Sequence, residues 1–565
     1  MNRTPVRIEL ISDFNPEILC RYLEHGGELP DCTVAIDGFN QVFQSLDRND
    51  GEAFPDVTVV WTRPEGVLPS VAMALAHRPF HLAEADAEVD AFVERLAARA
   101  QRGGTLLVAT WTLPPGYRGL GPLEHRPGLG AAHLVGRCNV RLAEALAGVG
   151  NAFLLDADAW MRAAGPQAGS PRQWFAGKVP FSNRVFQDAA RDIKAALAGA
   201  AGLSRRLILV DLDDTLWGGV VGETGWQGIR LGGHDAVGEA YAAFQESLKA
   251  LTRRGLLIGV VSKNDEAVAL AAFDHHPEMR LRRSDLAGWR IDWMDKAANV
   301  ASLAGELNLG LSSVVFIDDN PMERGRVAES LPDVLVPDWP RDPLLFVDAL
   351  RGLRCFDAVQ FSNEDRGRAR MYAEERGRRA VRASVGRLED WLGGLDLRVA
   401  IHPLDAAALP RAVQLLNKTN QMNLSTRRLS EVELLAWAQQ PGRQVWTVSV
   451  GDRFGESGLT GLLGIAWEGP VAHVVDFVLS CRVMGREIEK AMLFVAVQQA
   501  RAGGAAWLVA RHLPTERNAP CLAFWRTSGF AERGVLEFAW DTATDYPLPD
   551  HISLTGFSRS ETTHA

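Results

Sequence analysis

The sequence is poor in cysteine and contains no long apolar run. Its six cysteines are scattered among 565 residues and form no Cys-x-x-Cys pair. We therefore expect neither a structural zinc site nor a disulfide framework, and we expect a cytoplasmic protein. No uninterrupted apolar window is long enough for a transmembrane helix, which predicts that the chain does not span a membrane. The first residues include acidic side chains and lack the apolar core of a signal peptide.

An excess of basic charge is also missing. The chain has 60 Lys and Arg residues against 70 Asp and Glu residues, which gives a formal net charge of −10. This balance disfavours nucleic acid and anionic membranes as partners. An arginine-rich stretch at residues 366–387 is interrupted by glutamates, and such a pattern is typical of a solvated helix.

The length predicts several domains, because 565 residues are too many for one hydrophobic core. Over residues 1–200, short apolar segments alternate with helical stretches, and they begin at Val6, Cys32, Asp56, Gly104 and Ala152. This alternation predicts a parallel α/β sheet. Residues 205–350 repeat the pattern and predict a second, Rossmann-like α/β domain. A charged helical connector is expected over residues 351–393, and the β-rich segments of residues 394–565 predict an α+β domain.

The segment Arg206–Gly219, RLILVDLDDTLWGG, leads from an apolar strand into three aspartates. Asp211 and Asp213 lie on the same side of the chain at the end of this strand, where open α/β sheets bind ligands. Two carboxylates this close repel each other unless a cation lies between them, and such oxygen ligands suit Mg²⁺. Asp211 could then attack a phosphoryl group while Asp213 acts as general acid and base. Taken alone, the segment is equally compatible with an acidic turn.

Segments downstream favour phosphoryl-transfer chemistry. A second strand ends at Ser262, which can bind phosphoryl oxygens, and Lys296 can neutralise charge that develops at phosphorus. A third strand ends in Asp318 and Asp319, which are further candidate metal ligands. The same segments supply three more substrate-binding candidates, which are Thr215, Lys263 and Asn264.

The C-terminal domain places a cysteine at a predicted turn. The apolar strand that begins at Val471 is expected to run to Cys481, and a turn and a helix follow it. A helix N-terminus lowers the pKa of a thiol, and Arg482 adds positive charge, so Cys481 is a candidate nucleophile. A small buried core residue is the alternative. His512, at the end of the next predicted strand, is the candidate base.

Other polar residues of this domain have two interpretations. Asn420, Arg427 and Arg428 belong to a polar loop that could bind a phosphate or a carboxylate, or could be a hydrogen-bonded loop. Asn518 could bond an acyl chain or pantetheine, or could cap a helix.

The ordered set of strand-Asp-x-Asp, strand-Ser, Lys and strand-Asp-Asp resembles the signature of the haloacid dehalogenase-like (HAD) phosphatases. The segments DLDDTLWGGVVGE, VSKND, DWMDKAANV and FIDDNPMER are similar to those of the FkbH-like branch, the glyceryl transferase/phosphatases of polyketide assembly. The resemblance covers nearly the whole chain and includes LLNKTNQMNLSTRR and PTERNAPCLAFWRTSGF. Asp214 is a departure, because the family commonly carries Asn there, and it adds a negative charge near the metal.

The resemblance implies a bifunctional enzyme. Cys481 would attack the acyl phosphate of 1,3-bisphosphoglycerate to form a thioester. The central domain would remove the remaining phosphate through Asp211 and Mg²⁺. The glyceryl group would then pass to the phosphopantetheine thiol of a separate acyl carrier protein. A Mg²⁺-dependent phosphatase without acyl transfer, another phosphorylated hydroxy acid as donor, and a non-enzymatic scaffold are the alternatives.

The two outer domains resemble other folds. Residues 394–565 resemble a GNAT acyltransferase, but Glu487 stands where the coenzyme A loop has Gly or Ala, and this disfavours free acyl-CoA. Residues 1–200 resemble a degenerate SGNH hydrolase. Ser12 and Asp13 follow the first strand without the glycine of the GDS-like turn, so we expect a non-catalytic domain that docks a partner.

Overall fold

The computed structural model describes residues 5–25, 30–48, 54–233, 235–358, 378, 382, 387–515 and 517–556. For Leu388, Lys418 and Cys481 it describes the backbone alone. The chain divides into two compact units, residues 1–283 with 289–366 and residues 284–288 with 367–565. Most of the predicted connector over residues 351–393 lies outside the described residues. Among the described helices, none is long and apolar enough to cross a membrane.

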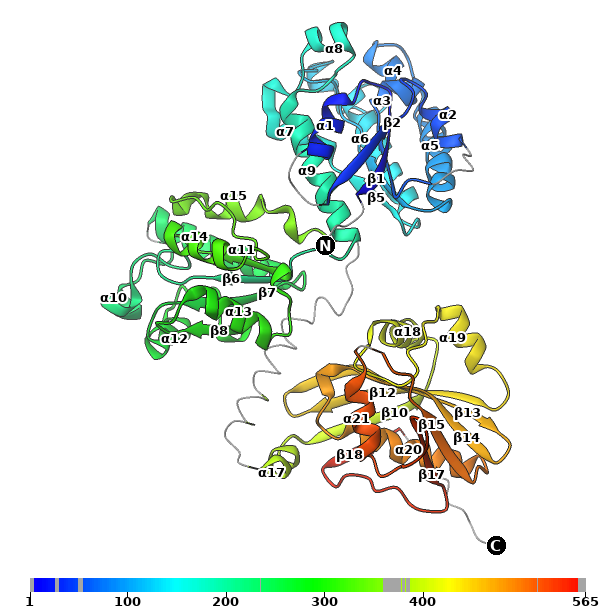
Figure 1. Ribbon diagram of the computed structural model, residues 1–565. Coiled ribbons are helices and arrows are strands. Elements are labelled where there is room, and N and C mark those ends of the chain that lie inside the picture. The colour runs from blue at the N-terminus through cyan, green and yellow to red at the C-terminus, as the bar shows by residue number, and fades with distance from the viewer. Residues whose placement is uncertain are drawn as a thin grey trace. The chain divides into compact units, whose positions relative to one another are not determined.

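The first unit begins with a parallel sheet, as the strand–helix alternation predicts (Figure 1). The strand order is β2-β1-β3-β4-β5, and every neighbouring pair is parallel. The strands are β1 (Val6–Ser12), β2 (Cys32–Ile36), β3 (Val57–Trp61), β4 (Thr105–Ala109) and β5 (Ala152–Leu155).

Helices cover both faces of this sheet. On one face Leu10 packs with α1 (Glu17–His25), α7 (Ala157–Ala164) and α9 (Asn183–Ala200). On the other face Ile11 packs with α5 (Leu82–Gln101) and α6 (Ala131–Leu146). The remaining short helices and 3-10 turns are α2 (Val42–Asp47), α3 (Pro64–Val67), α4 (Pro69–Leu75), η1 (Gly121–Leu123), η2 (Gly165–Gln167) and α8 (Pro171–Gly177).

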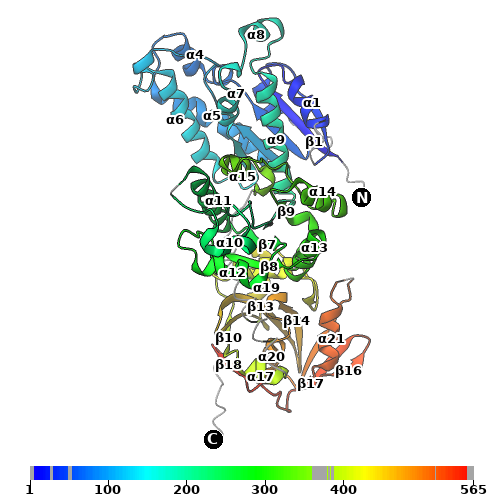
Figure 2. The same ribbon diagram turned by 90° about the vertical axis from the view of Figure 1, so that its left-hand side faces the viewer.

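A second parallel sheet follows in the order β8-β7-β6-β9. Three of its strands, β7, β8 and β9, are labelled in Figure 2. Its strands are β6 (Leu207–Val210), β7 (Leu257–Ser262), β8 (Leu286–Ile291) and β9 (Val314–Ile317). Every residue of β6, β7 and β9 is buried, which explains their continuous apolar sequences. The accompanying helices and turns are α10 (Val221–Gly228), α11 (Ala236–Thr252), α12 (Glu266–His275), η3 (Arg283–Asp285), α13 (Lys296–Glu306), η4 (Leu311–Ser313), α14 (Pro321–Ser330), η5 (Pro343–Leu345), α15 (Phe346–Arg351) and η6 (Arg354–Phe356).

The second unit contains a mixed sheet in the order β16-β17-β15-β14-β13-β12-β10-β18, with β11 paired to β14. The strands are β10 (Leu397–Pro403), β11 (Met422–Asn423), β12 (Arg443–Asp452), β13 (Gly455–Glu468), β14 (Val471–Leu479), β15 (Trp507–Arg511), β16 (Ala531–Gly534), β17 (Glu537–Asp541) and β18 (Ile552–Thr555). The helices and the 3-10 turn are α17 (Leu388–Gly393), α18 (Leu409–Lys418), α19 (Glu431–Ala438), η7 (Cys481–Val483), α20 (Ile488–Ala502) and α21 (Ala519–Thr527). The described residues therefore form a multidomain α/β protein with two parallel sheets and one mixed sheet.

Candidate functional site

The predicted phosphoryl-transfer residues gather at the carboxyl edge of the second parallel sheet. Val210, the last residue of β6, lies opposite Val260 on one side and Ile317 on the other. Asp211 continues this register, because its N–H donates to the carbonyl of Ile317 (3.0 Å). Asp318 is the next residue of the neighbouring strand. Parallel pairing therefore places the two aspartates side by side.

Three carboxylates meet at this edge and form what we call the carboxylate group, which is Asp211, Asp318 and Asp319. One oxygen of each lies within 4.8 Å of the others. Asp211 and Asp318 are buried, at 7% and 0% exposure. The Oδ1 atom of Asp211 is buried and has no hydrogen-bond partner among the described residues. A buried carboxylate oxygen without a donor fits a hard divalent cation, so the three residues could hold one.

Lys296 is the counter-charge of this group. It is the first residue of α13, which Asp295 caps by accepting from the N–H of Ala298 (3.1 Å). Its Nζ lies 2.6 Å from Oδ2 of Asp318 and 3.0 Å from Oδ2 of Asp211. Burial raises the pKa of Asp211 to about 6, although Lys296 opposes this rise. Burial lowers the pKa of Lys296, but the two aspartates raise it more, and the ammonium stays charged.

Asp213 lies apart from the carboxylate group. Its Oδ1 accepts from the indole N–H of Trp217 (2.9 Å) and from the N–H of Val221 (3.1 Å). Its Oδ2 accepts from Nδ2 of Asn264 (3.0 Å), which also donates to Oγ of Ser262 (3.2 Å). Asn264 thus contacts Asp213 and Ser262 rather than an open site. The metal and acid–base roles of Asp213 stay predictions.

The loop after β6 adds two contacts to the group. The hydroxyl of Thr215 donates to Oδ1 of Asp319 (3.2 Å) and accepts from its N–H (3.1 Å). Asp214 adopts a left-handed backbone (φ 53°), a conformation that Asp and Asn tolerate. Burial raises the pKa of Asp319, and the charges of Asp211 and Asp214 raise it further. Lys263, predicted to bind substrate, pairs with Glu323 (2.6 Å).

Sequence reasoning missed two residues of this site. Trp217 holds Asp213, as described above, and Arg324 of α14 donates from Nη1 to the carbonyl oxygens of Asp318 and Asp319, both at 2.8 Å. An arginine in the first turn of a helix that follows an Asp-Asp pair was the available signal, because helical side chains point back toward the helix N-terminus.

The cysteine of the second unit begins a turn rather than ending a strand. We predicted that the strand runs to Cys481, but β14 ends at Leu479, and Cys481 opens the 3-10 turn η7. The N–H of Ser480 donates to the carbonyl of Thr460 (2.7 Å), which adds one hydrogen bond to β13 beyond the end of β14 before η7 forms. The helix α20 begins only at Ile488. Only the backbone of Cys481 is described, so its role stays a prediction.

Two arginines follow Cys481 in the sequence, and both make hydrogen bonds within the fold. Arg486 is buried and donates to Oδ2 of Asp452 (3.2 Å) and to the carbonyl of Arg482 (2.8 Å). Asp452 also accepts from Arg378 (2.6 Å). Arg482 donates to Oγ of Ser480 (3.1 Å). The turn is therefore fixed to the β12–β13 connection by a buried ion pair.

His512 and Asn518 are buried, at 2% and 1% exposure. Neither ring nitrogen of His512 has a hydrogen-bond partner in the described part of the chain, and burial lowers its pKa, so the ring is neutral. Asn518 donates to the carbonyls of Asn423 (3.1 Å) and Leu513 (2.8 Å) and accepts from the N–H of Thr515 (2.7 Å). These contacts commit the Asn518 amide to the fold.

The polar loop after α18 is internally hydrogen-bonded. Arg427 donates to Oδ1 of the buried Asp476 (3.0 Å), and its guanidinium lies 4.6 Å from the ring centre of Trp437. Arg428 donates to Oδ1 of Asn420 (2.7 Å). The contacts favour the hydrogen-bonded loop over a preformed phosphate site.

Among the described residues, the carboxyl edge of the N-terminal sheet carries no group of carboxylates comparable to the carboxylate group of the second sheet. The hydroxyl of Ser12 bonds only to the backbone of Phe14 (3.1 Å for both contacts) among the described residues. Both oxygens of the buried Asp13 accept from Arg63, from its N–H (2.8 Å) and from its Nε (3.0 Å). Arg63 also lies over the ring of Trp174 (4.0 Å). These contacts leave Ser12 without an activating base.

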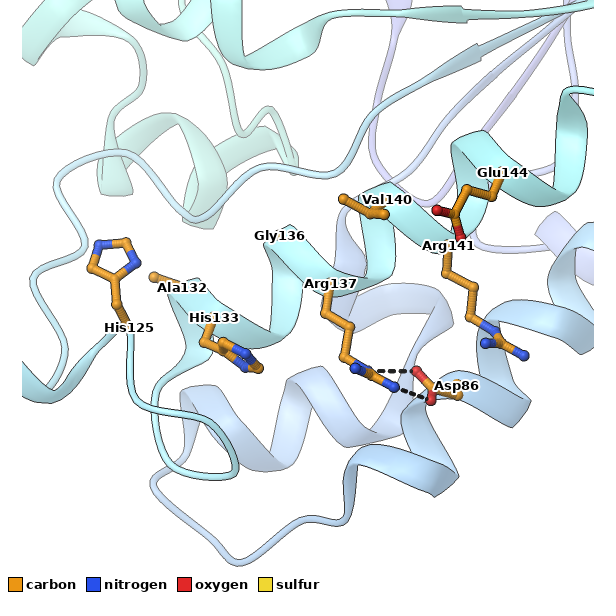
Figure 3. A pocket seen from close by; sticks show the side chains of 9 residues that line it. All are labelled: Asp86, His125, Ala132, His133, Gly136, Arg137, Val140, Arg141 and Glu144. Carbon is orange, nitrogen blue, oxygen red and sulfur yellow. Dashed lines mark hydrogen bonds and ion pairs between the residues drawn. The ribbon is translucent and has the colours of Figure 1, made fainter.

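Two cavities lie in the N-terminal region. One, of about 500 Å³, is lined by the loops after β1 and β2 and by the end of α8. The other, of about 610 Å³, runs along α6, where Arg137 pairs with Asp86 (2.8 and 2.5 Å; Figure 3). Neither is lined by the carboxylate group.

Among the solved structures similar to this chain is one from Bacteroides fragilis. It is the N-terminal part of protein BF1531 from Bacteroides fragilis, described as containing a phosphatase domain complexed with Mg. The identity is 25%, the TM-score is 0.58, and the match covers 63% of this chain and 95% of that one. No family model matches the chain, and no curated protein matches it.

Two acetyltransferase structures are similar to about a quarter of the chain. The ribosomal-protein-S18-alanine N-acetyltransferase of Escherichia coli is 15% identical and covers 26% of this chain and 94% of its own, with a TM-score of 0.20. The IAA acetyltransferase of Bacillus cereus is 17% identical and covers 25% of this chain and 99% of its own, with a TM-score of 0.19.

Proposed function

We propose that the chain is a Mg²⁺-dependent phosphatase of the HAD type whose reaction is coupled to acyl transfer. The observation that carries the proposal is the buried carboxylate group with Lys296 at the carboxyl edge of a parallel sheet. The Bacteroides fragilis relative, a phosphatase domain complexed with Mg, supports both the reaction and the metal.

The carboxylate group would hold Mg²⁺, which supplies electrostatic stabilisation of the charge that develops on the phosphoryl oxygens. A carboxylate oxygen of Asp211 attacks phosphorus as the bond to the leaving oxygen breaks, and Asp213 donates a proton to that oxygen. Asp213 then removes a proton from the water that cleaves the phosphoaspartate, which releases inorganic phosphate and restores Asp211. Lys296 and the hydroxyl of Ser262 bind the phosphoryl oxygens in both steps, and Thr215 and Lys263 line their approach.

The acyl half-reaction belongs to the second unit. Cys481 takes the acyl group of 1,3-bisphosphoglycerate as a thioester, with release of phosphate from the acyl carbon. After dephosphorylation, the thiol of a phosphopantetheine arm attacks the thioester, and the Cys481 thiolate leaves. The resemblance of this region to the FkbH-like family supports the assignment, with Arg482 and His512 as the candidate residues beside Cys481. The predicted binding residues Asn420, Arg427, Arg428 and Asn518 are engaged in the structural hydrogen bonds described above.

A carrier protein fits this unit better than free coenzyme A. Glu487 holds the left-handed N-cap position of α20 (φ 61°), and its carboxylate pairs with Lys490 (2.6 Å). A carboxylate at that position repels a pyrophosphate. We assign partner docking to residues 1–200, phosphatase chemistry to residues 205–350, a connecting role to residues 351–393, and acyl transfer to a GNAT-like domain over residues 394–565 of a cytoplasmic enzyme.

Intact-protein mass spectrometry tests the coupling. The full chain, Cys481→Ala and Asp211→Asn are each incubated with Mg²⁺ and enzymatically generated 1,3-bisphosphoglycerate. We expect a glyceryl adduct on the wild type, no adduct on Cys481→Ala, and an adduct that retains its phosphate on Asp211→Asn. Mg²⁺-dependent phosphate release without an adduct on any form would leave a phosphatase that performs no acyl transfer from this donor.

A further inference from the structure

We propose that Arg324 is a positioning residue that sets the affinity of the carboxylate group for its divalent cation. The inference rests on the proposed metal-dependent function of that group. Arg324 donates from a single nitrogen, Nη1, to the carbonyl oxygens of Asp318 and Asp319, both at 2.8 Å. Two of the three grouped carboxylates therefore belong to residues whose backbone one guanidinium holds.

These two hydrogen bonds fix the backbone from which the carboxylates project. A peptide unit is planar, so holding two successive carbonyl oxygens fixes the planes on either side of Asp319. The direction in which each side chain leaves the backbone is then set. The side chains carry their own restraints, since Asn320 N–H donates to Oδ1 of Asp318 (2.9 Å) and Thr215 contacts Asp319. Arg324 supplies the backbone part of the same arrangement.

The arrangement needs a restraint because the group repels itself before a cation arrives. One oxygen of each of the three carboxylates lies within 4.8 Å of the others, and Asp211 and Asp318 are buried, so water screens their charges poorly. Without Arg324, the loop after β9 could relieve this repulsion by moving the carboxylates apart. Binding a cation would then require that they be brought together again, and this requirement would weaken binding. The permanent charge of the guanidinium also offsets the repulsion.

The helix that carries Arg324 makes it a rigid support. Asn320 caps α14 by accepting from the N–H of Met322 (2.9 Å), and Pro321 occupies the first helical position. Proline there is pre-organised for the helix. Arg324 follows within the first turn, and its side chain reaches back over the loop that ends β9. Arg324 is thus only five residues from Asp319 in the sequence.

A second arginine on the same helix provides a matched control. Arg326 pairs with the side chain of Asp295 (3.1 Å) and is largely exposed, at 58%. Among the described residues, its guanidinium hydrogen-bonds to Asp295 and not to the backbone carbonyls of Asp318 and Asp319. Its replacement removes an arginine and a salt bridge from α14 without touching the loop after β9.

The test is calorimetric titration of the metal-free full chain with Mg²⁺, for the wild type, Arg324→Ala, Arg324→Lys and Arg326→Ala. Loss of an outer partner of a metal ligand typically weakens metal binding 10- to 100-fold. We therefore expect the Kd for Mg²⁺ to rise about tenfold or more in Arg324→Ala. Arg324→Lys should recover part of the loss, because an ammonium can still donate to a carbonyl. Arg326→Ala should stay within about twofold of the wild type.

Kinetics separate positioning from general damage. In Arg324→Ala, the Mg²⁺ concentration for half-maximal phosphate release should rise, while kcat at saturating Mg²⁺ falls much less. Equal Kd values for Arg324→Ala and the wild type would overturn the inference and leave the proposed function intact, as would equal losses in Arg324→Ala and Arg326→Ala. If Arg324→Ala does not fold, Arg324→Met, which keeps most of the side-chain length but has no donor, takes its place, and an unchanged Kd in that variant has the same force. A wild-type chain that binds no Mg²⁺ would overturn the proposed function itself.

Discussion

The first unit contains two parallel sheets, and in each of them a buried aspartate follows the carboxyl end of a strand. The surroundings of the two aspartates are opposite. Asp13 follows β1 and Asp211 follows β6, and both are buried. Both oxygens of Asp13 accept hydrogen bonds from Arg63, whereas Oδ1 of Asp211 accepts none from the described residues. A Cβ atom on Gly66 would lie 2.1 Å from the Asp13 carboxylate, so that edge is also closely packed.

The difference lies in which groups face each aspartate. The Asp13 carboxylate is satisfied by a single arginine, whereas the Asp211 carboxylate shares Lys296 with Asp318 and lies within 4.8 Å of both Asp318 and Asp319. The same architecture thus yields a structural ion pair at one edge and an incomplete site at the other. Fold alone does not distinguish them, because function depends on the side chains that the strand ends present.

The largest expected difference in kcat is between the two variants in which one of these aspartates is replaced by asparagine. Asp211→Asn removes the proposed nucleophile, and we expect kcat for phosphate release to fall at least about 1,000-fold. Asp13→Asn should leave kcat within about twofold of the wild type. Steady-state phosphate release measures both. Comparable losses of kcat in the two variants would contradict the proposal that catalysis belongs to the edge at Asp211 and not to the edge at Asp13.

Replacing a lysine at each of the two edges should also change kcat to different extents. Lys296→Met removes the charge beside Asp211 and Asp318, and we expect kcat for phosphate release to fall about 100-fold or more. Lys178→Met, beside Trp174 at the other edge, should not change kcat. The assay is phosphate release at saturating Mg²⁺, with circular dichroism as the folding control. Full activity of Lys296→Met would contradict its assigned role.

Protons should compete with the cation at Asp211. Burial raises its pKa to about 6, so the carboxyl is ionised above pH 6 and protonated below it. Binding below pH 6 must release this proton, and the apparent affinity for Mg²⁺ should be about tenfold weaker at pH 5 than at pH 7. Calorimetric titration at pH values between 5 and 7 measures this change in affinity. Asp13→Asn should show the same pH dependence as the wild type. A pH-independent affinity would exclude Asp211 as the titrating ligand.

Arg63→Ala should destabilise the first unit without affecting catalysis. The change leaves the Asp13 carboxylate buried without its partner, which costs about 3 kcal/mol. The thermal midpoint should fall, while kcat/KM for phosphate release by the folded protein stays unchanged. The double variant with Asp13→Asn should regain part of the lost stability, because it removes the unpaired charge. A double variant no more stable than Arg63→Ala would contradict this explanation.

The smallest effect is expected from Ser12→Ala. Its hydroxyl bonds only the local backbone of Phe14 among the described residues, so its loss should cost about 1 kcal/mol of stability. Phosphate release and acyl transfer should stay unchanged. A loss of any hydrolytic activity in this variant would show that the N-terminal sheet is catalytic.

The sequence predicts the strands and the edge of the site well, because local patterns determine them. The continuous apolar runs of β6, β7 and β9 each lead into a polar residue of the site, and parallel pairing then brings Asp211 and Asp318 together. Contacts between residues far apart in the chain are not visible in this way. The ion pair of Arg63 with Asp13 and that of Arg427 with Asp476 depend on residues about fifty positions apart.

The end of β14 is another feature that depends on residues far apart in the chain. Leu479 pairs with Gly461 on one side and with Met422 on the other, and the ladder stops there. The apolar pattern continues past Leu479, so it predicted a strand that runs to Cys481. On one side the partner β11 begins at Met422, whereas on the other β13 continues beyond Gly461, and neither bound is visible in the segment itself.

The most direct test of the contrast between the two edges is titration of the metal-free full chain with Mn²⁺, followed by electron paramagnetic resonance. We expect one tightly bound ion per chain in the wild type and in Asp13→Asn, and binding at least about tenfold weaker in Asp211→Asn. Binding by Asp211→Asn as tight as that of the wild type, or loss of the ion in Asp13→Asn, would contradict this expectation.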